Sequence, residues 1–183
     1  MAVTDTKKYT VQEKLNKMDV DLITIICAAK RSSGADELMI EVTEIPNAVS
    51  VPGGSSILQS MFLHNEHASQ FPAGVYFISD SSRTFLAEDL GGDDAADAIG
   101  ESISGEDMGG STILTGIQAS FTVASSSFDQ VGSSDSYAMI DTGGIPVKAA
   151  SGSTSLYLWA MTTSSTVPST DQNVNIKLGF VKD

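Results

Sequence analysis

The C-terminal stretch Lys148–Asp183 reads KAASGSTSLYLWAMTTSSTVPSTDQNVNIKLGFVKD and contains two strongly apolar runs. The runs are TSLYLWAMTT (154–163) and NVNIKLGFV (173–181), and serine, threonine and glycine surround them. Short runs of aromatic and β-branched residues between turn-forming residues are typical of β-strands. Neither run contains a set of side chains that could attack a bond, hold a metal or bind a phosphate. The stretch therefore predicts scaffold.

The same pattern extends toward the N-terminus. We expect strands in seven further runs: 20–28, 37–45, 56–64, 73–80, 111–124, 137–141 and 144–150. Turn signals separate the runs and no sustained helical pattern follows Gly34, so the expected fold is all-β, a jelly-roll-like β-sandwich. Runs 56–64 and 73–80 are expected to form a hairpin-like unit with a long loop, and 125–136 is expected to be a loop.

The N-terminal region allows two interpretations. Thr10–Glu13 reads TVQE, a capping-box pattern that can open a helix, and apolar residues continue at helical spacing to Ala29. However, VDLITIICA (20–28) is rich in β-branched residues and apolar on both faces, which favours a buried strand. We expect a short helix at about 11–18 followed by a strand. This divides the chain into an N-terminal arm, residues 1–18, and a single β-sandwich domain, residues 19–183.

Composition narrows the classes of function. The 183-residue chain has 41% hydrophobic residues, enough for one packed domain, and a formal net charge of −13. That charge repels phosphate backbones, so nucleic acid is not an expected partner. The longest apolar run, Leu22–Ala29, is too short for a membrane span, and the polar N-terminus resembles no secretory signal, which predicts synthesis in a cytoplasm. The single cysteine, Cys27, is expected to be a buried apolar residue.

No candidate for catalysis or for a cofactor emerges. His64 and His67 in HNEH would need a third ligand to hold zinc, and we interpret the segment as a surface turn. The acidic stretch 88–107 has enough carboxylates to bind calcium but lacks the spacing of a calcium loop, so a solvated loop is expected. The chain has no nucleophile–base motif, which predicts a protein that is not an enzyme, with no catalytic, cofactor-binding or metal residues.

Two sets of residues are candidates for contacts with other proteins. Tyr157 and Trp159 alternate on one face of a strand, where they either pack in a core or contact a partner subunit or a sugar. The arm carries most of the basic residues near the N-terminus, and it is expected to contact an acidic neighbour: Lys7, Lys8, Lys14 and Lys17. The alternative is that the arm packs on its own sandwich or mediates subunit contact.

Several segments taken in order carry a resemblance to a known group of proteins. They are GGSSILQSMFLHNEHAS followed by GVYFISD, then DDAADAIG, then GGIPVKAASGSTSLYLWAMTTSSTV and NVNIKLGFVKD, within residues 33–183. In this order the sequence resembles small virion proteins of tailed bacteriophages, including jelly-roll head-decoration (cement) proteins. No single motif is chemically specific; the order and spacing of several weak motifs carry the resemblance.

The resemblance implies a non-enzymatic virion structural protein located on the capsid surface. Its expected partners are the major capsid protein, which it would stabilise in the head shell, and itself, as a homotrimer. The expected alternative is a tail-fibre or spike module that binds host carbohydrate.

Overall fold

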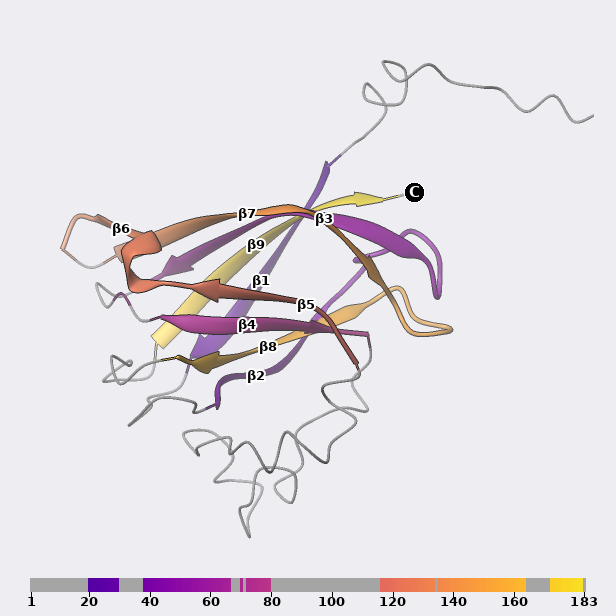
Figure 1. Ribbon diagram of the computed structural model, residues 1–183, viewed down its shortest axis with the longest axis horizontal. Coiled ribbons are helices and arrows are strands. Elements are labelled where there is room, and N and C mark those ends of the chain that lie inside the picture. Colours follow the sequence, from indigo (N-terminus) through magenta and orange to yellow (C-terminus); the bar gives the residue numbers. More distant parts are fainter. Residues whose placement is uncertain are drawn as a thin grey trace, which may run out of the picture.

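The computed structural model describes residues 20–29, 38–66, 70, 72–79, 116–133, 135–163 and 172–182. These residues form nine β-strands and one short 3-10 helix, η3, arranged in two sheets (Figure 1). The elements are β1 Val20–Ala29, β2 Leu38–Ile45, β3 Ser55–Asn65, β4 Ala73–Ile78, β5 Ile117–Val123, η3 Ser125–Ser127, β6 Phe128–Val131, β7 Asp135–Lys148, β8 Leu156–Thr162 and β9 Gln172–Lys182. The all-β prediction is confirmed. The expected helix at 11–18 and the arm boundary lie outside the described residues.

The strands pair as a set of nested hairpins. β4 pairs with β5, β3 with β7, β2 with β8, and β1 with β9, all antiparallel. Further pairing of β3 with β9 and of β4 with β8 joins these hairpins into a five-stranded sheet, β1-β9-β3-β7-β6, and a four-stranded sheet, β2-β8-β4-β5. A long hairpin rolled into two sheets in this way is the jelly roll, to which β6 adds one edge strand.

This topology corrects the expected hairpin of runs 56–64 and 73–80. β3 lies in the five-stranded sheet and β4 in the four-stranded sheet, so the two strands are not hydrogen-bonded to each other. The expected loop 125–136 is also corrected in part, because residues 128–131 form β6 along β7. Short polar strands of this kind carry a weak sequence signal, since only one of the four side chains, Phe128, is buried.

One core fills the space between the sheets. Both sheets contribute fully buried aliphatic and aromatic side chains, among them Leu58, Phe77, Leu158, Ile176 and Phe180. Each such side chain contributes about 1.5–3 kcal/mol relative to an exposed position, so this layer is the main source of stability.

Irregular pairing explains two further differences from the expected strands. Alternation in 37–45 places Leu38, Ile40 and Val42 on one face, but Ile40 joins the core between the sheets while the other two join a separate cluster. Register shifts between β2 and β8 on both sides of Ile40 cause this change. Run 137–141 and most of run 144–150 belong to one strand, β7, whose pairing with β3 shifts register between Asp141 and Ile145. Gly143 and Gly144 lie within this shift and have φ angles of 68° and 76°.

Connections close one end of the sandwich. Residues 46–54, between β2 and β3, pack beside residues 149–155, between β7 and β8. Backbone hydrogen bonds from Val49 N to Thr154 O (3.1 Å) and from Gly53 N to Ser153 O (2.8 Å) join them. Gly53 has a φ of 71°, which explains why a glycine occupies this turn. Pro46, Pro52, Gly53 and Gly54 predict a connection at 46–54, and that prediction is confirmed, whereas residues 149–150 were expected to belong to a strand.

Candidate functional site

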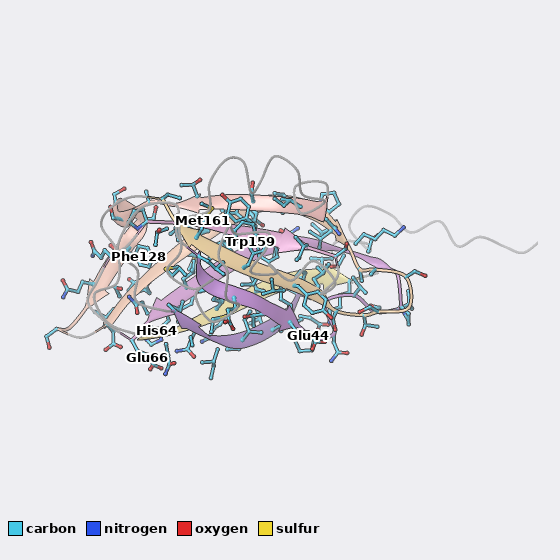
Figure 2. All side chains as sticks on the ribbon, turned by 90° about the horizontal axis from the view of Figure 1, so that it is seen from below. Glu44, His64, Glu66, Phe128, Trp159 and Met161 are labelled. Carbon is cyan, nitrogen blue, oxygen red and sulfur yellow. The ribbon has the colours of Figure 1, made fainter. Side chains whose placement is uncertain are left out.

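The described surface offers three places to examine: the polar end of β3, the outer face of the four-stranded sheet, and the outer face of the five-stranded sheet. Figure 2 shows His64 and Glu66 near each other at one end of the sandwich, with Glu44 toward the other end. The acidic stretch 88–107 and the arm lysines Lys7, Lys8, Lys14 and Lys17 lie outside the described residues.

The polar end of β3 is a set of paired side chains. His64 Nε2 lies 3.3 Å from Asp135 Oδ1 at the start of β7, and both side chains are more than a third exposed. Glu66 accepts hydrogen bonds from Asn175 Nδ2 (3.0 Å) and Asn173 Nδ2 (3.4 Å) of β9. In the described part of the chain, no three histidine, cysteine, aspartate or glutamate side chains are grouped as metal ligands would be. His67, the other half of HNEH, lies outside the described residues.

These contacts have a structural role. Glu66 follows β3 directly, and its two amide partners are on the neighbouring strand, so the carboxylate fastens the end of β3 to β9. Exposed ion pairs contribute about 0–1 kcal/mol each, so the His64–Asp135 contact adds little stability.

The outer face of the four-stranded sheet carries a second apolar cluster. Its buried members are Leu38, Ile78, Trp159 and Met161, and Val42, Tyr76, Ile117 and Tyr157 pack against them. Trp159 is fully buried and its ring stacks on that of Tyr76, with centroids 4.2 Å apart and an interplanar angle of 14°. Figure 2 shows Trp159 and Met161 side by side along β8.

This cluster locates the two aromatic candidates of β8. Tyr157 and Trp159 do share one face, as alternation predicted, and that face points away from the space between the sheets. The burial of Trp159 agrees with packing, the first of the two expected roles. Tyr157 is only partly buried, so it has surface to offer a partner. A contact of these residues with another subunit stays a prediction.

The outer face of the five-stranded sheet exposes apolar side chains that the sequence reasoning missed. Leu22 is 72% exposed and Ile26 69% exposed on β1, and Met139 on β7 is 73% exposed. Phe62 and Tyr137 stack between them with ring centroids 5.8 Å apart, and Lys177 Nζ lies 5.7 Å from the centroid of the Phe62 ring. This face therefore combines exposed aliphatic groups with partly buried aromatic rings.

The missed signal was visible in VDLITIICA (20–28). Its apolar residues on both faces suggested a strand buried on both sides. β1 is instead an edge strand: Ile25, Cys27 and Ala29 face the core, while Leu22 and Ile26 face outward. Exposed apolar side chains on an edge strand are typical of a surface that contacts another protein chain.

Cys27 is a buried apolar residue, as expected. Its side chain is 2% exposed and belongs to the core between the sheets. Burial raises the pKa of its thiol to about 11, while a side-chain hydrogen bond with Thr43 acts in the opposite direction. The thiol is thus protonated at neutral pH and a poor nucleophile.

Comparison with known proteins finds no sequence match and weak structural similarity. No family model and no curated protein matches the sequence. Among solved structures, tomato aspermy virus is 9% identical with a TM-score of 0.36, covering 97% of this chain and 82% of that chain. A heated full particle of Israeli acute paralysis virus is 10% identical with a TM-score of 0.28, covering 99% of this chain and 81% of that chain. Desmodium yellow mottle tymovirus is 12% identical with a TM-score of 0.23, covering 100% of this chain and 92% of that chain.

Similarity at this level does not assign a function, so the jelly-roll assignment rests on the strand order itself. Within the described residues, no helix is long and apolar enough to span a membrane.

Proposed function

We propose that this chain is a non-enzymatic virion structural protein, a decoration protein that binds the head shell of a tailed bacteriophage. Its partners in this proposal are the major capsid protein and further copies of itself, as a homotrimer, on the capsid surface. The jelly roll serves many functions, including capsid and lectin domains, so the fold alone does not select this one.

One observation carries the proposal: the described segments on which the resemblance rests lie, in order, along the strands of one sandwich. The ILQSMFLH segment forms most of β3, GVYFI lies in β4, LYLWAMT is β8 and NVNIKLGFVK lies in β9. Each of these four strands is a direct neighbour of another in the set, β3 of β9 and β4 of β8. Weak motifs that meet in one sandwich support a common architecture better than the same motifs scattered over separate units.

The surface of the described residues also suits a shell component. Apolar side chains of β1 are exposed on the outer face of the five-stranded sheet, where a neighbouring protein could bury them: Val20, Leu22 and Ile26. A decoration protein needs such faces because its function is to bind neighbours in a repeated array.

The alternative, a tail-fibre or spike module that binds carbohydrate, predicts aromatic rings open to solvent. In the described ranges every aromatic side chain is buried or partly buried, including Phe62, Tyr76, Tyr137, Tyr157 and Trp159. This distribution favours the decoration role.

The test is the position and copy number of the chain in purified virions. Electron cryomicroscopy of intact particles should place it on the head shell, and quantitative mass spectrometry should give copy numbers in the hundreds. A location in the tail with only a few copies would favour the spike module, and absence from purified particles would contradict both roles.

A further inference from the structure

We propose that the free edge of β1 pairs with β1 of a second copy of this chain, so that two five-stranded sheets join into one continuous sheet. This contact is an antiparallel, two-fold pairing centred on Thr24. The inference does not depend on the virion role, because it follows from the exposed edge, its sequence and its register.

The first step is that β1 has an available edge. β1 pairs along its full length with β9 on one side, and it is the last strand of its sheet in the described part of the chain. A ten-residue strand is about 33 Å long, which presents a long row of backbone donors and acceptors. Soluble proteins usually protect such an edge with lysine, proline, a bulge or a short strand.

The second step is that β1 has none of these protections. Its sequence VDLITIICAA contains no lysine and no proline, and its pairing with β9 has no register shift. Its single charge, Asp21, is at one end and forms an ion pair with Lys182 Nζ at 2.7 Å. The segment from Leu22 to Ala29 is therefore free of charges that would oppose a second strand.

The third step is the apolar strip beside the edge. Leu22 and Ile26 extend outward at 72% and 69% exposure, and Leu22 lies opposite Gly179 of β9. A Cβ at Gly179 would lie 2.6 Å from Ser60 Oγ of β3 and 3.2 Å from Val20 Cγ1 of β1, so this glycine leaves room for the side chains of both neighbouring strands. Lys177, opposite Thr24, extends the other way over the Phe62 ring. The strip thus stays apolar up to the edge.

The fourth step selects the occupant. In an antiparallel pair centred on Thr24, Leu22 of each copy lies opposite Ile26 of the other, which gives two apolar cross-strand pairs on one face. A shift of two residues in either direction places Leu22 or Ile26 opposite Thr24 instead. A second copy therefore fits this edge in one preferred register, and a two-fold axis uses the same patch on both partners. The contact gives dimers, or joins larger assemblies in pairs, and differs from the three-fold contact that a homotrimer requires.

The principal test is the association of the full chain, measured by sedimentation velocity from about 5 to about 200 μM, the upper range being ample for a modest interface. The wild type should associate with rising concentration. Ile26→Lys should weaken association by roughly tenfold or more, because a charge on the edge opposes strand pairing. Met139→Lys is the matched control: it changes a residue equally exposed on the same outer face but on β7, and it should leave association unchanged.

A cross-link tests the register. In a Cys27→Ala background, Thr24→Cys should form a disulfide-linked dimer under mild oxidation, because opposed residues at the centre of the pair bring the two thiols within bonding reach. Met139→Cys in the same background should remain unlinked. If circular dichroism shows that Ile26→Lys does not fold, the cross-link still tests whether β1 pairs with β1 of a second copy.

Three results would overturn the proposal. A monomeric wild type at the highest concentration excludes it. Association that survives in a folded Ile26→Lys variant excludes the β1 edge. Association of any order, including a trimer, without a cross-link in the Thr24→Cys variant excludes the two-fold register.

Discussion

Adjacent isoleucines on β1 offer a direct test of how this strand is placed. Ile25 is 7% exposed and faces the core, whereas Ile26 is 69% exposed and faces outward. The two side chains are identical and belong to the same strand. Replacing either with alanine removes the same three carbon atoms, so the two variants differ only in the environment of those atoms.

The expected losses differ severalfold. Removing three buried carbon atoms at about 0.8 kcal/mol each costs about 2.4 kcal/mol, and the cavity term brings the loss for Ile25→Ala to about 3 kcal/mol. Ile26 is about two-thirds exposed, so Ile26→Ala should cost less than about 1 kcal/mol by the same reasoning. In a chain of this size, a loss of 3 kcal/mol corresponds to a decrease in Tm of about 6–12 °C.

Urea denaturation followed by the fluorescence of Trp159, the single tryptophan, provides the assay. Protein at about 1 μM limits any association through β1, so the two free energies of unfolding report on the isolated chain. Equal losses for the two variants would refute the assignment of Ile25 to the core face and of Ile26 to the open face of β1. A larger loss for Ile26→Ala would mean that its side chain, not that of Ile25, faces the core.

Three further predictions concern other parts of the chain. Between pH 9 and 11 the unfolded state loses the Cys27 proton while the folded state keeps it. The free energy of unfolding of the wild type, relative to that of Cys27→Ala, should therefore fall by about 1.4 kcal/mol per pH unit. If urea denaturation shows the same difference between the two proteins across this range, the thiol is not buried. His64→Ala should change the free energy of unfolding by less than about 1 kcal/mol, because it removes one exposed contact with Asp135, and should leave particle assembly intact. A specific loss of assembly that added zinc restores would indicate a metal site. If the arm lysines tether the body to the shell, deletion of residues 2–17 should leave the melting curve unchanged but reduce incorporation into particles, with a larger loss at high salt. Unchanged incorporation would show that the arm is not the tether. Failure to fold would show that these residues belong to the domain.

The sequence predicted what depends on local pattern. Strand positions followed from apolar runs such as 154–163, and the turn at Gly53 followed from the glycine and proline residues around it. Each of these signals is contained within a few consecutive residues. The fold class and the absence of sustained helical periodicity after Gly34 followed from the same reasoning.

The parts that could not be predicted depend on residues far apart in the chain. Assignment of β3 and β4 to different sheets is a matter of long-range pairing, and the faces of Leu38 and Ile40 depend on register shifts against β8. The edge position of β1 has the same origin. Its apolar residues are compatible with a buried strand; its pairing with β9 alone shows that one edge is free, and the exposure of Leu22 and Ile26 shows that one face is open.

The nesting of the hairpins also determines the order in which the molecule can be completed. The β4–β5 pair lies innermost, and the β1–β9 pair, which joins Val20 to Val181, closes last because it has the largest loop. During synthesis β1 therefore emerges before its partner and stays unpaired until β9 has left the ribosome. Such a topology folds slowly, since high contact order lowers the folding rate, and the waiting strand is the most aggregation-prone segment of the nascent chain. We expect the yield of native protein to be governed by how long β1 remains unpaired, and to rise at lower expression rates or with a chaperone that binds extended apolar segments.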